Sequence, residues 1–291
     1  MLPNFLCVGA QKAGTTWLHA ELERVSDVFV PTRRKEVHFF DEYYDRGPDW
    51  YADFFPRGSE AQAFAAVGEI TPMYLYHSEA PQRIKDTLGD PKLIIMLREP
   101  VARLMSQYRM DFSRGQFEGS PEAFIETKPD AVARGVYSAQ IERYLNLFLS
   151  ENIQFLVFEE IFASPDATRA ALAAALAHLG SVATPQAEGV GRINAEVSTG
   201  RPRMGGLYKT ANAAADWLRR HDLDIVVNVA RRMGVSKSSF GDTATAPPRF
   251  QPSTLDRLQT IYDEDRENVE QLLGRPLSVW AKSPAPTALA V

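Results

Sequence analysis

The sequence predicts an α/β fold in which helices flank a central, mainly parallel sheet. The clearest sign is the run "KLIIML" from Lys92, because a short, wholly apolar segment is typical of a strand buried on both faces. The second is "FLCVG", a shorter run of the same kind that stops at Gly9 and is followed by a helical pattern. Strands that alternate with helices along the chain indicate parallel pairing through crossover connections.

The first half of the chain supplies four strands and three helices in this order. After "FLCVG", the segment "TTWLHAELERV" has apolar residues at helical spacing, and "DVFV" is a short strand. "AAVGEITPMYLY" predicts a strand that ends near Glu69 in a Thr-Pro turn. "PQRIKDTLG" predicts a helix closed by Gly89. "KLIIMLREP" ends at Arg98, and Pro100 begins the helix "VARLMSQYRMDFSRG".

The second half predicts one more strand and more helix. "YSAQIERYLNLFLS" is a helical pattern, and "IQFLVFEEI" is the next buried strand. "SPDATRAALAAALAHLG" predicts a helix with Ser164 as its N-cap, Pro165 in its first turn and Gly180 at its end. The segment 185–248 has few strand signals and Arg-rich turns, and "STLDRLQTIYDEDRENVEQLLG" predicts the last long helix.

Length, charge and cysteine content limit the possible functions. A chain of 291 residues fits a single domain over 1–280, with 185–248 as a loop and helical segment covering a site and 281–291 as a flexible tail. The net charge of −5 argues against a surface that coats nucleic acid. No apolar run approaches the roughly 18 residues that cross a membrane. One cysteine, Cys7, fits a reducing compartment, so we expect a cytoplasmic protein.

The loop "GAQKAGTT" lies between the first strand and the first helix and carries the chemistry. It matches the Walker spacing from Gly9 to Gly14, but Thr15 stands at the lysine position and Lys12 lies inside the loop. Backbone N–H groups at a helix N-terminus bind anions, and Lys12 adds a positive charge on the same side. The sequence therefore predicts a P-loop-like turn for a phosphate or sulfate group, with a ligand-free βα turn as the alternative.

A kinase or ATPase would need more than this loop. Such enzymes hold Mg²⁺ with the P-loop hydroxyl and an Asp at a strand end. Here the clearest strand ends in Arg98, and "FLVFEE" ends in glutamates. This pattern weakens the Mg-ATP interpretation without excluding it.

The combination of motifs resembles the sulfotransferases that use 3′-phosphoadenosine 5′-phosphosulfate (PAPS). The phosphosulfate loop of that family is similar to "QKAGTTWL", with its lysine in mid-loop. Its second signature is an arginine at a strand end and a serine eight residues later, which Arg98 and Ser106 supply in "LREPVARLMSQY". The resemblance implies that this pair binds the 3′-phosphate of the cofactor.

Within that superfamily the sequence resembles the heparan-sulfate branch, the glucosaminyl N- and 3-O-sulfotransferases. "KEVHFFDEYYDRGPDWYADFFP", "GEITPMYLY" and "RPLSVW" are similar to segments of those enzymes, and the patchy likeness runs from about residue 4 to 280. Ile70 stands where that branch has a substrate-side lysine, so a heparan acceptor does not follow from the resemblance.

The resemblance also implies roles for individual residues. Lys12 would stabilise the leaving group, Glu36 would act as general base, and His38 would line the same pocket. No metal is expected, and PAPS would leave as adenosine 3′,5′-bisphosphate (PAP). The acceptor would be a hydroxyl, less readily an amine, of a carbohydrate or small metabolite. The residues implied in cofactor binding are Gln11, Lys12, Ala13, Gly14, Thr15, Thr16, Trp17, Arg98, Ser106, Gly200 and Arg201.

Other interpretations of these residues stay open. Lys35 and Glu36 could form a solvated charged turn, and Arg98 could pair with Glu99 or Asp111. Tyr137 could match a family tyrosine or face the core, while Trp50 and Tyr51 fit packing better than a substrate platform. Whether His38 and Arg203 are functional is open as well. At the level of the whole chain, the alternatives are a P-loop kinase and a non-catalytic nucleotide-binding protein. The sequence names neither the acceptor nor the oligomeric state.

Overall fold

The computed structural model describes residues 1–184, 205–233 and 247–281. The chain forms two compact units. The first comprises Met1–Arg103, Arg134–Ile193 and Arg257–Val291, and the second comprises Leu104–Ala133 and Asn194–Asp256. All the strands in the described part of the chain belong to the first unit.

These strands form one sheet in the order β2-β3-β1-β4-β5, and every neighbouring pair is parallel. The predicted parallel sheet is therefore confirmed. Cys7 on β1 lies opposite Ile70 of β3 on one side and Ile94 of β4 on the other. The strands are β1 (Phe5–Gly9), β2 (Val28–Phe29), β3 (Ala66–Ile70), β4 (Lys92–Leu97) and β5 (Ile153–Val157).

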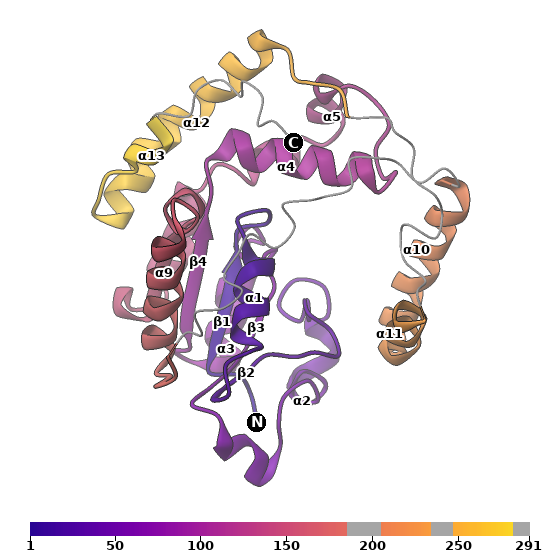
Figure 1. Ribbon diagram of the computed structural model, residues 1–291, viewed down its shortest axis with the longest axis vertical. Coiled ribbons are helices and arrows are strands. Elements are labelled where there is room, and N and C mark those ends of the chain that lie inside the picture. Colours follow the sequence, from indigo (N-terminus) through magenta and orange to yellow (C-terminus); the bar gives the residue numbers. More distant parts are fainter. Residues whose placement is uncertain (185–204, 234–246, 282–291) are drawn as a thin grey trace. The chain divides into compact units, whose positions relative to one another are not determined.

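Helices flank this sheet, and Figure 1 shows α1 and α9 beside it. The helices of the first half are α1 (Thr15–Leu22), α2 (Gly47–Ala52), α3 (Ala80–Leu88), α4 (Pro100–Ser113), α5 (Pro121–Thr127) and α6 (Pro129–Ala133). Those of the second half are α7 (Ser138–Leu145), α8 (Phe158–Ile161), α9 (Pro165–Leu179), α10 (Gly205–Arg220), α11 (Asp224–Arg232), α12 (Pro252–Leu273) and α13 (Ser278–Ala281). Short 3₁₀ turns are η1 (Tyr44–Arg46), η2 (Gly58–Ala63) and η3 (Ser150–Asn152).

The predicted ends of α9 agree with the structure, whereas the helix predicted over 137–150 ends at Leu145 and the next predicted strand is also too long. The Ser164 side chain accepts the N–H of Ala167 at the start of α9, and Gly180 ends that helix in the left-handed conformation. The predicted strand "IQFLVFEEI" is too long, because β5 ends at Val157 and the next four residues form the helical turn α8. An apolar run alone does not distinguish a strand from the start of a buried helix.

The order of the strands indicates where a fold of this kind binds its ligand. β1 lies at the centre; after it the chain forms β2 and β3 on one side of β1 and then crosses to form β4 and β5 on the other side. In open α/β sheets, ligands bind beyond the carboxyl ends of the strands at this kind of switch point. The residues that follow β1, β3 and β4 meet there, so the loop after Gly9 lies at the position where the fold favours a ligand.

Both units have their own cores. The central strands of the first unit are buried, and burial raises the pKa of the Cys7 thiol to about 12, which leaves it unreactive. In the second unit, Tyr108 packs its ring against Phe112, Phe124 and Phe250. Among the described residues, none of the helices has the length and apolarity needed to cross a membrane.

Candidate active site

The loop between β1 and α1 presents backbone N–H groups at a helix start. Gly14 is the N-cap of α1 with a φ of 97°, a left-handed conformation that favours glycine. A Cβ at this position would lie 3.2 Å from Phe158 and 3.3 Å from Met96. Within the described residues, no acceptor takes the N–H groups of Gly14, Thr15 and Thr16. These three donors are therefore suited to an anion, as the sequence predicts.

Lys12 and Arg98 meet at this loop. Arg98 Nη1 donates to the Lys12 carbonyl oxygen at 3.1 Å, and the guanidinium lies over the Phe158 ring at 4.3 Å. Lys12 itself has a left-handed φ of 72°, a backbone strain of about 1–3 kcal/mol for a residue with a side chain. The strand-end arginine thus fixes the strained turn that carries the predicted catalytic lysine.

The carboxylates proposed as alternative partners of Arg98 have other contacts. Glu99 accepts the N–H groups of Val101 and Ala102 at 3.0 and 2.7 Å, so it caps α4. Asp111 forms an ion pair with Lys128 at 2.7 Å.

Tyr137 faces the core and also supports the strand end. It is fully buried, and its hydroxyl donates to the Arg98 carbonyl oxygen at 2.9 Å. The backbone N–H of Tyr137 is in turn held by Asp265. These contacts favour the packing interpretation of this tyrosine.

The structure does not bring the remaining predicted cofactor residues together with Arg98. Ser106 lies on α4 in the second unit, whereas Arg98 lies in the first, so their joint binding of a 3′-phosphate stays a prediction. Gly200, Arg201 and Arg203 lie outside the described residues.

Not every side chain of the loop faces its open side. Ala13, Thr15 and Trp17 are buried, and the Trp17 indole packs edge-on against Phe162. Trp17 therefore belongs to the core, and its backbone N–H already donates to the Gly14 carbonyl oxygen at 2.9 Å, so its contact with a cofactor stays a prediction. Gln11 and Thr16 are half-buried, and their side chains accept hydrogen bonds from Arg134 and Lys35.

Lys35 joins the loop to the predicted general base. Its Nζ donates to Thr16 Oγ1 at 2.8 Å and lies 3.5 Å from Glu36 Oε1. Sequence reasoning missed this role, because the contact spans 19 residues and the pair looked like a charged turn. The contact places Glu36 beside the helix start.

Glu36, His38 and Asp41 form a hydrogen-bonded row. His38 Nδ1 lies 2.9 Å from Asp41 Oδ2, and its Nε2 lies 3.5 Å from Glu36 Oε2. Burial would lower the pKa of His38, but the hydrogen bonds that its ring donates to Asp41 and Glu36 outweigh burial and raise that pKa to about 10. Burial would likewise raise the pKa of Glu36, yet His38 and Lys35 hold it below its ordinary value. The site therefore keeps an ionised carboxylate beside an imidazolium.

The same region contains three side chains of the types that bind metal ions. Among the described residues, donor atoms of His38, Asp41 and Glu42 lie within 4.8 Å of one another. A metal-binding histidine must be neutral, whereas a pKa of about 10 keeps His38 protonated near neutral pH. The hydrogen bonds to His38 account for the cluster, and the expectation that no metal is required stays a prediction.

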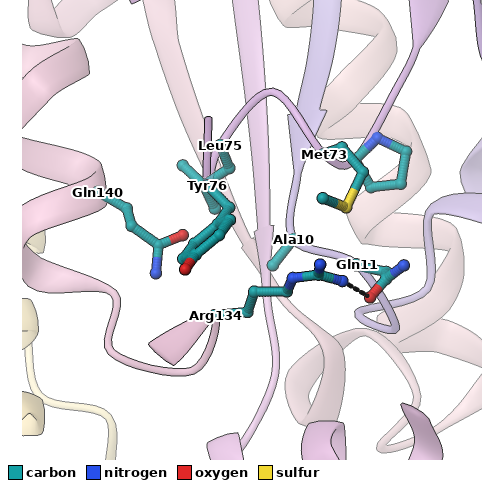
Figure 2. A pocket seen from close by; sticks show the side chains of 8 residues that line it. Ala10, Gln11, Met73, Leu75, Tyr76, Arg134 and Gln140 are labelled. Carbon is teal, nitrogen blue, oxygen red and sulfur yellow. Dashed lines mark hydrogen bonds between the residues drawn. The ribbon is translucent and has the colours of Figure 1, made fainter. Parts of the chain in front are cut away.

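A small pocket opens beside the loop (Figure 2). Arg134 projects into it, donates to Gln11 Oε1 at 2.9 Å and lies 5.4 Å from the centre of the Tyr76 ring. No sequence motif pointed to Arg134, because Arg134 lies 123 residues after Gln11 in the chain and belongs to none of the recognised motifs. The lining residues are Ala10, Gln11, Pro72, Met73, Leu75, Tyr76, Arg134 and Gln140.

Comparison with known proteins shows the family of the chain. Residues 2–173, more than half of the chain, match the family described as "Sulfotransferase domain", so the chain belongs to the sulfotransferase family. It is 32% identical over 173 residues to the human heparan sulfate glucosamine 3-O-sulfotransferase 3B1, which covers 56% of this chain and 43% of that protein. It is 37% identical over 107 residues to the membrane-associated sulfotransferase kil1 of Dictyostelium discoideum, covering 37% of this chain and 22% of that one.

The fold also has a solved counterpart. A sulfotransferase from Alicyclobacillus acidocaldarius superposes with a TM-score of 0.67 at 24% identity, covering 97% of this chain and all of that one. This likeness supports the P-loop-like α/β fold. The chain spans less than half the length of the curated relatives named above.

Proposed function

We propose that this sulfotransferase moves a sulfuryl group from PAPS to a hydroxyl, less readily an amine, of a carbohydrate or small metabolite. The observation that carries the proposal is the convergence at the loop. Lys12 and Arg98 are joined there, three N–H groups at the helix start have no acceptor among the described residues, and Lys35 brings Glu36 to the same helix start. Such an arrangement combines an anion cradle with an ionised base.

The loop would hold the phosphosulfate end of the cofactor. The N–H groups of Gly14, Thr15 and Thr16 fit an anion at the positive end of α1, and Lys12 supplies a cation on the same turn. PAPS, when bound, supplies a sulfuryl group attached to a phosphate leaving group. Negative charge grows on the leaving oxygen, so the Lys12 ammonium favours the transition state over the ground state.

Glu36 would take the proton of the acceptor. Its lowered pKa keeps the carboxylate ionised at neutral pH, and His38 and Lys35 fix its orientation. General base catalysis of this kind contributes typically about 10²–10⁴-fold. His38 and Lys35 lower the pKa of Glu36 and so make it a weaker base. A weak base suits a reaction in which the acceptor loses its proton late, after the bond to sulfur has begun to form.

The small pocket beside Gln11 would receive at most a small polar group of the acceptor, because it has room for about one water molecule. Its walls are mostly apolar, and Arg134 offers a guanidinium held by Gln11. The human relative is named for heparan sulfate. In this chain Ile70 stands where the heparan-sulfate branch has a substrate-side lysine, and the Ile70 side chain is fully buried. We therefore propose an acceptor other than heparan sulfate.

The kinase alternative receives less support. Its metal would need a free carboxylate after a strand, and the candidates follow β5. Glu159 accepts the N–H of Glu99 at 3.1 Å and of the Trp280 indole at 3.0 Å. Glu160 forms a two-pronged ion pair with Arg275 at 2.6 and 2.9 Å. Both glutamates therefore serve the structure.

Thermal shift measurements with PAP and with Mg-ATP test the proposal. PAP at 100 times its Kd should stabilise the chain by about 2.7 kcal/mol. Lys12→Ala and Arg98→Ala should weaken PAP binding roughly 10–100-fold, because each removes a charged partner of the anion. Glu36→Gln should bind PAP as tightly as the wild type.

Lys85→Ala and Arg57→Ala are the matched controls, since each removes a surface cation that pairs with an aspartate. Neither should change the PAP shift. Stabilisation by Mg-ATP alone would contradict the proposal and favour a kinase. PAP binding without transfer to any acceptor in a broad panel would favour a non-catalytic nucleotide-binding protein.

A further inference from the structure

Three consecutive backbone N–H groups follow Glu36, and each is held from the end of β3 or the turn after it. Val37 N–H donates to Glu69 Oε2 at 3.3 Å. His38 N–H donates to Thr71 Oγ1 at 3.4 Å. Phe39 N–H donates to the Tyr74 hydroxyl oxygen at 2.8 Å. The segment that carries the proposed base is thus fixed at every residue from 37 to 39.

The hydroxyls that receive these N–H groups both donate to Glu69. Thr71 Oγ1 donates to Glu69 Oε2 at 2.6 Å, and the Tyr74 hydroxyl donates to Oε1 at 2.7 Å. The Tyr51 hydroxyl also donates to Oε1, at 2.9 Å. All four side chains are fully buried. The three paths from the backbone therefore end on one buried carboxyl group.

The direction of these hydrogen bonds depends on Glu69. A hydroxyl has one hydrogen, so a hydroxyl that donates to Glu69 leaves its lone pairs to accept a backbone N–H. Each oxygen of Glu69 accepts two hydrogen bonds, which suits an ionised carboxylate, an acceptor at both oxygens. Burial raises the pKa of Glu69, and the four donors oppose that effect. A glutamine here would place an NH₂ group against two donors.

Glu69 is also well placed to resist movement. It lies near the end of β3, where Leu6 of β1 is its register partner in the middle of the sheet. His38, by contrast, has a left-handed φ of 59°, which a non-glycine residue keeps only when its surroundings impose it. The rigid strand thus imposes a strained backbone on the loop that holds the ionised base.

We propose that Glu69 is a positioning residue: through Thr71 and Tyr74 it fixes the backbone of residues 37–39 and so sets Glu36 and His38 against the cofactor loop. This inference rests on the proposed function in one respect, the assignment of Glu36 as base. Glu69 touches neither the cofactor loop nor the proposed acceptor pocket in the described contacts, so it acts only through the segment that it holds.

Two tyrosines provide a matched pair for the test. Tyr74→Phe and Tyr51→Phe each remove one buried hydroxyl from the same oxygen of Glu69. Only Tyr74 also accepts a backbone N–H from the segment, that of Phe39. A merely structural cluster predicts similar effects for both variants, whereas positioning predicts that they differ.

The first measurement is steady-state kinetics with PAPS and the best acceptor found. Tyr74→Phe and Glu69→Gln should lower kcat about 10- to 100-fold, since a displacement near 1 Å costs that much. Their PAP affinity should stay within about twofold of the wild type, because the cofactor loop is untouched. Tyr51→Phe should keep kcat within about twofold. Equal kcat values for the two tyrosine variants would overturn the inference.

The second measurement needs no turnover. NMR titration of the His38 ring reads its contacts with Glu36, Asp41 and Glu42, the acidic groups that face it. The wild-type ring should titrate near pH 10. Tyr74→Phe should lower that pKa, and Tyr51→Phe should leave it in place. An unchanged His38 titration in Tyr74→Phe contradicts positioning even if the wild type transfers sulfate, and absence of transfer in the wild type contradicts only the proposed function.

Discussion

At the scale of single residues, backbone strain is concentrated at the proposed chemistry. Among the described residues, the non-glycine positions with positive φ are Lys12, His38 and Asp222, and the first two are the proposed cation and the neighbour of the proposed base. Strain of this kind persists only where surrounding contacts impose it. Arg98 holds the carbonyl of Lys12, and Thr71 holds the N–H of His38. The molecule therefore sets these two side chains by fixing their backbones.

The pH dependence of kcat should report the contact between His38 and Glu36. In the wild type the pKa of Glu36 lies below its ordinary value, so the acid limb of the kcat profile should lie below the pH at which a free glutamate gains its proton. His38→Asn removes the imidazolium and leaves burial to dominate, which raises the pKa of Glu36. The acid limb of the kcat profile should then move to higher pH.

His178→Asn serves as the control for that measurement, since His178 contacts the Leu93 carbonyl at 3.2 Å and lies on α9 away from Glu36. Its acid limb should coincide with that of the wild type. An acid limb in His38→Asn that stays at the wild-type pH would mean that His38 does not control the ionisation of Glu36.

At the scale of elements, the strand–loop–helix unit could be predicted because its signals are local. Buried runs, a glycine before Thr15 and the capping residues Ser164 and Gly180 each act within a few positions, and the structure agrees with them. The contacts that complete the site are not local. Lys35 reaches Thr16 across 19 residues, and Val37 reaches Glu69 across 32. Residue spacing carries no signal for such contacts, so both Lys35 and Glu69 were missed.

Gly14 should be required for both stability and ligand binding. Gly14→Ala places a side chain at a φ of 97° and a Cβ at 3.2 Å from Phe158, so we expect a loss of about 1–3 kcal/mol on denaturant unfolding. The distorted helix start should also bind PAP at least about tenfold less tightly.

Gly180→Ala is the matched control, because Gly180 has a φ of 78° at the end of α9 with open space around it. It should cost about 1 kcal/mol and leave PAP affinity unchanged. Equal PAP affinities in Gly14→Ala and the wild type would show that the loop does not bind the anion.

At the scale of the whole molecule, the order of the strands brings distant motifs together. The loop after β1, the turn after β3 and Arg98 after β4 meet at one edge of the parallel sheet, although 86 residues of sequence separate Lys12 from Arg98. The parallel sheet could be predicted from the alternation of strands and helices. The division into two units was not predicted, because Arg98 and Ser106 look contiguous in sequence while the unit boundary falls between them on α4.

Transfer of labelled sulfate from PAPS in the presence of EDTA tests the proposed reaction most directly. Wild-type protein and Glu36→Gln are compared over one panel of hydroxyl and amine acceptors, with PAP affinity measured on both. We predict metal-independent transfer by the wild type, and a loss of about 10²–10⁴-fold in Glu36→Gln with unchanged PAP affinity. Transfer that requires Mg²⁺, or a Glu36→Gln variant as active as the wild type, would contradict direct sulfuryl transfer with Glu36 as the base.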